Sequence, residues 1–129
     1  MSSGLELYNS RINHLTSVNG ATVIHFSVAY ILKVKGIPGC DPGSEWSQEA
    51  NIVLEDATIS GAPPPLPNTV ADGFLEVDGK RYEVIPIPLH SKNKARLSLR
   101  FVDNTEVDIV GTTPRIDLSG TPIFLEEIR

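Results

Sequence analysis

Residues 21–35 constrain the fold more than any other part of the chain, because apolar and polar side chains alternate there almost without interruption. Successive side chains of a β-strand point to opposite faces, so this pattern predicts a long strand with one buried face. The Asn19-Gly20 pair just before it is typical of a two-residue hairpin turn and predicts a partner strand over 11–18. On the buried face we place four core residues: Ile24, Phe26, Val28 and Leu32.

Further hairpin signals follow toward the C-terminus. A two-residue turn at Asp78-Gly79 and a three-residue loop at 102–104, with its last residue left-handed, predict two more hairpins. Their registers bring opposite charges together across the strands, pairing Glu76 with Arg81 and Arg100 with Glu106. A Ser119-Gly120 turn is then expected to separate two short strands, near 115–118 and 123–125.

The N-terminal residues 1–10 admit two interpretations. Ser3-Gly4-Leu5-Glu6 matches a helix capping box, but the residues that follow are mostly poor helix formers, so we favour a strand over 11–18. Two segments rich in Pro and Gly, 36–46 and 61–72, must leave the sheet and form the long connections.

The composition is that of one soluble domain spanning residues 1–129, with 40% hydrophobic and 21% charged residues. Many short strands separated by turn residues predict an all-β fold. We expect an antiparallel β-sandwich or a partly open β-barrel of about eight or nine hairpin-connected strands, with little helix.

Charge and motif content bound the function. A net charge of −5 argues against a nucleic-acid partner, because phosphate backbones attract a surplus of Lys and Arg. The chain has neither an apolar run of ~18 residues nor a signal-peptide layout, so we expect no membrane partner and a cytoplasmic location. We find no cofactor motif and expect no cofactor. The single cysteine, Cys40, cannot form an internal disulfide, and the carboxylate of Asp41 beside it disfavours a nucleophilic thiolate.

A histidine pair is the most specific candidate for chemistry. The two-residue turn at Asn19-Gly20 sets His14 directly opposite His25, with Cβ atoms within ~5.5 Å, close enough to share a proton or a metal ion. The alternative is two polar side chains on the solvent face of a hairpin, and we expect no metal. An enzyme built on this pair would use Tyr30 or Asp56 as its acid–base partner.

The long connections supply a candidate binding site, since loops on a β scaffold commonly carry binding residues. Asp41, Glu45 and Asp72 would make the site acidic, and Trp46 would give it an aromatic floor. Such a site suits a cationic or sugar-like ligand or a basic protein. Alternatively, Trp46 folds back as a lid on the core.

These features favour a binding or interaction module that takes a protein partner or a small ligand at the 36–46 and 61–72 loops. The alternatives are a small enzyme on the histidine pair and an acidic, inhibitor-like partner of a basic protein. We also expect a symmetric dimer, because a strand over 21–35 would extend ~50 Å, whereas a domain of this size is about 30 Å across. A second copy would cover its other apolar face, formed by Val23, Ala29 and Ile31. A bulge that bends the strand is the competing explanation.

Overall fold

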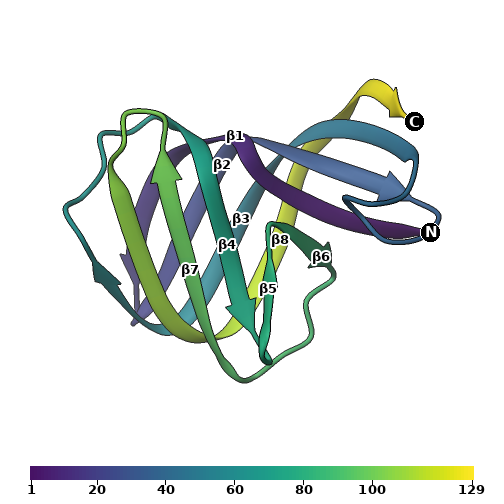
Figure 1. Cartoon of the computed structure of the whole chain (residues 1–129). Helices are drawn as coiled ribbons and strands as arrows, with labels where there is room; N and C mark the ends of the chain where they lie inside the picture. Colours follow the sequence, from purple (N-terminus) through teal and green to yellow (C-terminus); the bar gives the residue numbers. More distant parts are fainter.

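The computed structural model describes all residues 1–129 as an all-β molecule without a helix, built from eight antiparallel strands in one sheet (Figure 1). The strands are β1 (Ser2–Val18), β2 (Ala21–Val34), β3 (Gly43–Ser60), β4 (Asn68–Val77), β5 (Lys80–Tyr82), β6 (Val84–Ile87), β7 (Lys94–Phe101) and β8 (Glu106–Ile128).

Six of the strands curl into a ring that is not quite a barrel. The sheet order is β5-β4-β7-β8-β3-β2-β1-β6, and an additional pairing of β4 with β1 joins the two ends of the ring. That closure is short, because it consists of Arg11 opposite Thr69 and Ile12 opposite Asn68. Beyond it β4 pairs with β5 and β1 pairs with β6, so the seam splits. The partly open form of the predicted all-β class is therefore the one observed.

The hairpin registers are confirmed at all three turns. Asn19-Gly20 and Asp78-Gly79 both have positive φ at both positions, as the predicted turn type requires. Asn104 is left-handed, with a φ of 69°. The predicted charge pairs lie directly opposite each other, Glu76 with Arg81 and Arg100 with Glu106.

Strand β2 changes the face that it turns to the core. Ile24 and Phe26 are buried, but the register with β3 shifts after Phe26, and from Ala29 on the other set of side chains points inward. An extra residue in one strand reverses the alternation of faces beyond it. The prediction that Val28 is a core residue is consequently wrong, since it is half-buried. Leu32 is buried, but on the face opposite Ala29 and Ile31 and outside the core cluster. The face proposed for a second copy is not available either, because Ala29 and Ile31 are fully buried.

The N-terminal residues belong to β1 from Ser2 onward, so the strand interpretation holds and extends beyond 11–18. Leu5 and Leu7 are fully buried, and this burial outweighs the capping-box signal.

The connection 61–67 covers one end of the ring, where Pro64 and Leu66 line an apolar hollow with core side chains. The connection after β2 is also shorter than predicted, since β3 already begins at Gly43.

The prediction of two short strands separated by a turn at Ser119-Gly120 is wrong, because β8 is one long strand there. It runs without reversal over Glu106–Ile128, and Ser119-Gly120 lies within it. Gly120 has a φ of +72°, and the register with β3 shifts across this residue, from Ile123 opposite Ser47 to Ser119 opposite Glu49, so β8 carries two extra residues there. The left-handed glycine therefore marks a bulge in a long strand.

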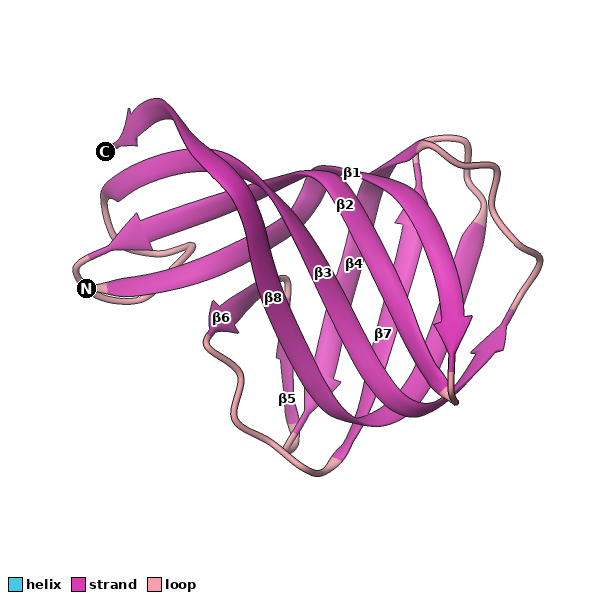
Figure 2. Ribbon diagram, turned by 180° about the vertical axis from the view of Figure 1, so that it is seen from behind, coloured by secondary structure: helices cyan, strands magenta, loops and turns pink.

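The long strands project beyond the ring as a twisted extension that also carries both chain termini (Figure 2). We call this extension the arm. It consists of paired segments from four strands: residues 2–6 of β1, 30–34 of β2, 43–48 of β3 and 118–128 of β8. Strand β6 pairs with β1 along one edge of the arm, whereas β8 forms the other edge.

Candidate functional site

Carboxylates from three strands surround a hollow on one face of the arm, which we call the acidic hollow. Glu6 of β1, Glu45 of β3 and Glu126 of β8 line a space of about 450 Å³. The register explains their proximity, since Glu45 lies directly opposite Glu126. Asp41 and Cys40, from the connection after β2, form another part of the wall.

Burial and mutual repulsion perturb two of these groups. Burial, and then the charge of Glu45, raise the pKa of Glu6 above its ordinary value. Burial and the charge of Glu126 likewise raise the pKa of Glu45. A positive group placed in the hollow would favour the ionised forms of both.

The loop residues beside the hollow have local structural roles. The Asp41 carboxylate accepts a hydrogen bond from the backbone N–H of Ile37, and this bond closes the loop on itself. Cys40 is exposed, and its thiol hydrogen-bonds to no side chain. Nothing in this geometry activates it as a nucleophile.

Trp46 lies on the opposite face of the arm from Glu45, because adjacent residues of β3 point to opposite sides. Its ring meets that of Phe124 edge to face, with centroids 5.4 Å apart. The Lys33 Nζ lies 4.7 Å from the ring centroid, and the indole Nε1 donates to the Ser44 Oγ at 2.9 Å. Trp46 therefore packs within the arm and is no floor for the acidic hollow.

Asp72 is not brought to the other acidic candidates. It is an exposed residue of β4, and its carboxylate lies 3.7 Å from the Arg100 guanidinium on β7. It lines a shallow hollow with that arginine and with Asp108. Of the four predicted binding residues, the structure places only Asp41 and Glu45 around one space.

The histidine pair has the predicted register, with His14 directly opposite His25. The imidazole centroids are 6.2 Å apart, and the His25 Nδ1 hydrogen-bonds to the Asn51 Oδ1 at 2.5 Å. An amide is the partner here, so no carboxylate orients either ring. No group of three or more His, Cys, Asp or Glu side chains is arranged to hold a metal ion.

The two acid–base candidates on other strands do not complete this site. Tyr30 lies opposite Glu6, in the part of β2 that belongs to the arm. Asp56 is exposed, in a left-handed conformation within an irregular stretch of β3. Neither hydrogen-bonds to an imidazole, and neither histidine lines the two largest hollows.

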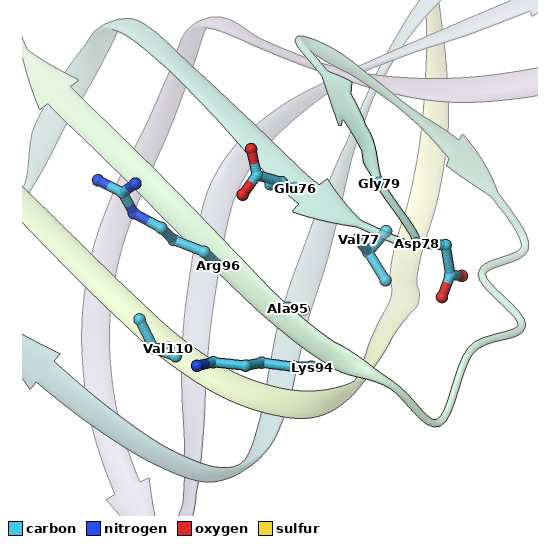
Figure 3. Close-up of a pocket in the computed structure, with 8 residues that line it drawn as sticks. All are labelled: Glu76, Val77, Asp78, Gly79, Lys94, Ala95, Arg96 and Val110. Carbon is cyan, nitrogen blue, oxygen red and sulfur yellow. The ribbon is translucent and has the colours of Figure 1, made fainter.

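The largest hollow lies beside the Asp78-Gly79 turn, between the ends of β4, β7 and β8, with a volume of about 540 Å³ (Figure 3). Its charged side chains are balanced, with Glu76 and Asp78 facing the same space as Lys94 and Arg96. Arg96 is paired with Asp108 at 3.0 Å. Little net charge remains here to select a charged ligand.

A run of three consecutive exposed apolar residues lies on β8, at the edge of the arm. Strand β7 pairs with β8 only up to Thr112, so residues 114–128 have no partner strand on that side, and we call them the open edge. Ile123, Phe124 and Leu125 are 60%, 46% and 43% exposed. The prediction from sequence missed this surface. The available signal was the three consecutive apolar residues, which an alternating strand cannot bury on one face.

In comparisons with known proteins, no protein-family model, curated protein or solved structure matches the chain. No helix of the structure could cross a membrane, since none is both long and apolar enough.

Proposed function

We propose that the protein is an interaction module that binds a polypeptide strand along the open edge. The observation that carries this proposal is the exposure of Ile123, Phe124 and Leu125 on a strand with no neighbour on its outer side. An unpaired edge presents a row of free N–H and C=O groups that can hydrogen-bond to another extended chain. The three apolar side chains add the contact area that gives such pairing its strength.

The position of the open edge supports binding in preference to a purely structural role. The ring holds the core, whereas the outer half of β8 lies on the arm and contributes no residue beyond Ile116 to the core cluster or its partly buried neighbours. Natural proteins usually protect long edges with charges, bulges or proline. Glu126, Glu127 and Pro122 protect parts of this edge, but the segment between them stays apolar. We therefore propose the open edge as the binding surface, in place of the 36–46 and 61–72 loops expected from the sequence.

A double substitution, Ile123→Thr with Leu125→Thr, tests the proposal while keeping two β-preferring residues on the strand. We expect the free energy of unfolding, extrapolated to infinite dilution to remove any effect of association, to stay within about 0.5 kcal/mol of the wild-type value. Retention on a phenyl matrix should fall, because the main exposed apolar segment is gone.

The matched control is Ile109→Thr, on the buried part of the same strand, which should cost several-fold more stability. A loss above about 2 kcal/mol for the double variant would assign the apolar segment to the fold. Unchanged retention would show that the open edge is not the adhesive surface. Either result contradicts the proposed function.

A further inference from the structure

We infer that the polypeptide strand bound at the open edge is basic, with lysine or arginine alternating with apolar residues. This inference rests on the proposed function and names the chemistry of its partner. Three features of the arm select this chemistry: the acidic hollow beside the edge, the surplus of negative charge in that hollow, and the difference between the two faces of β8.

The end of the open edge forms one wall of the acidic hollow. Glu126 and Ile128 of β8 line this space together with Glu45 of β3 and Glu6 of β1. A strand added along β8 would lie close beside Glu126, because directly opposed residues of paired strands have Cβ atoms about 4.5–5.5 Å apart. A long side chain of that strand on the Glu126 face would therefore reach the hollow.

The negative charge of the hollow exceeds the positive charge around it. The residues that line it carry five carboxylate side chains and a single cation, that of Arg129. None of the ion pairs of the structure involves any of these residues. Burial, and then the charge of a neighbouring glutamate, raise the pKa values of Glu6 and Glu45, so the carboxylates repel one another. An ammonium or guanidinium group supplied by a bound strand would relieve this repulsion.

The two faces of β8 differ where the edge meets the hollow. Glu126 lies opposite Glu45, and Phe124 lies opposite Trp46. Because Glu45 and Trp46 are adjacent residues of β3, Glu126 and Phe124 point to opposite faces of the sheet. One face of the edge is therefore acidic and the other aromatic. Successive side chains of a bound strand also point to opposite faces, so a strand that alternates cationic and apolar residues would match both.

The acidic face also carries an apolar side chain. Ile123 lies opposite Ser47, which is two residues from Glu45 and shares its face. The side chain of Ile123 is 60% exposed. Lysine and arginine combine an apolar stem with a charged head, so they suit a face that presents both an isoleucine and carboxylates.

Two synthetic peptides test this inference by fluorescence anisotropy. One has the sequence Lys-Val-Lys-Val-Lys-Val-Lys, and the other carries glutamine in place of each lysine, so the two differ in charge but keep the same alternation. Each labelled peptide is titrated with the protein at low concentration, where any association of two copies through the same edge is weakest.

Two protein variants separate the hollow from the overall charge. The site variant is Glu45→Gln with Glu126→Gln, and the matched control is Asp56→Asn with Glu106→Gln. Each removes two carboxylates, but the control residues are exposed and lie outside the arm. None of the four carboxylates forms an ion pair, so both variants should fold.

We expect the wild type to bind the lysine peptide roughly fivefold or more tightly than the glutamine peptide, as one or two cross-strand charge pairs would allow. The site variant should lose most of this preference, and the control variant should keep it. Equal affinity for the two peptides would overturn the basic partner, and so would the absence of binding of the lysine peptide. An equal loss of preference in both variants would overturn it as well, because overall charge would then explain the attraction.

The variant Ile123→Thr with Leu125→Thr locates the bound peptide. It should weaken the binding of both peptides alike, because it alters the apolar segment of the open edge and no charge. Unchanged binding of both would place the peptides elsewhere and overturn the inference. The proposed function is judged separately, by dilute-limit stability and matrix retention, so the absence of a charge preference leaves that result standing.

Discussion

The bend of β2 makes a quantitative prediction, because it determines which side chains of one strand carry the core. Phe26 is fully buried before the bend, and Val28 is half-buried at it. Phe26→Ala should lower the free energy of unfolding by about 3–5 kcal/mol, as truncation of a buried phenylalanine does. Val28→Ala removes two methyl groups, worth ~0.8 kcal/mol each when fully buried, so the partial burial of Val28 gives a loss of about 1 kcal/mol.

Urea denaturation followed by tryptophan fluorescence measures both values, since Trp46 is the only tryptophan. The informative quantity is the difference between the two stability losses, because the bend is the reason why two residues only two positions apart differ in burial. A regular strand would bury both. Losses of similar size, or a loss below about 1 kcal/mol for Phe26→Ala, would refute the switch of the buried face between Phe26 and Ala29.

Three further predictions concern the acidic hollow, the irregular pairing of β3 with β8, and the loop thiol. Because the folded state raises the pKa of Glu45, it holds that proton more tightly than the unfolded chain, so stability falls as the pH rises through the raised value. Glu45→Gln should therefore raise the free energy of unfolding by about 0.2–1 kcal/mol at neutral pH, near the lower end because solvent screens the pair. Below about pH 4 the substitution should have no effect, because Glu45 is then protonated in both states. Denaturation measured across pH would contradict this if the gain appeared in acid instead. Gly111→Ala should cost about 1–3 kcal/mol, because its new Cβ would lie 2.6 Å from the Glu55 carbonyl oxygen, and a variant as stable as wild type in urea would show that the two strands are looser than described. Cys40 should react with a thiol reagent in the native protein because it is exposed, and labelling that requires denaturant would mean that the loop covers it.

Local sequence signals determined much of the fold. The three turns at Asn19-Gly20, Asp78-Gly79 and Asn104 fix registers through backbone conformations that few residues adopt, so strand pairing around them follows from sequence. The facing of His14 and His25 follows from the same rule. Class and strand number were predictable because the turn signals recur at short intervals.

The remaining features depend on contacts that local patterns do not encode. The bulge in β2 changes which set of side chains faces the core, and the uninterrupted alternation of residues 21–35 does not predict this change. Gly120 has the left-handed conformation that a turn would need, yet β3 continues alongside it, so the chain does not reverse. Glu6, Glu45 and Glu126 lie close together only because β1, β3 and β8 all run through the arm, so their spacing in sequence does not predict this cluster.

The claim that the open edge is an interaction surface, together with the symmetric dimer expected from the sequence, is tested most directly by the mass in solution. Light scattering coupled to gel filtration at tens of micromolar should give about 28 kDa, twice the 14.0 kDa chain, for the wild type. Ile123→Lys, which introduces a charge into the exposed apolar segment of the open edge, should return the mass to 14.0 kDa without loss of fold. A wild-type mass of 14.0 kDa under these conditions would contradict the dimer, and an Ile123→Lys variant that stays dimeric would place the interface elsewhere.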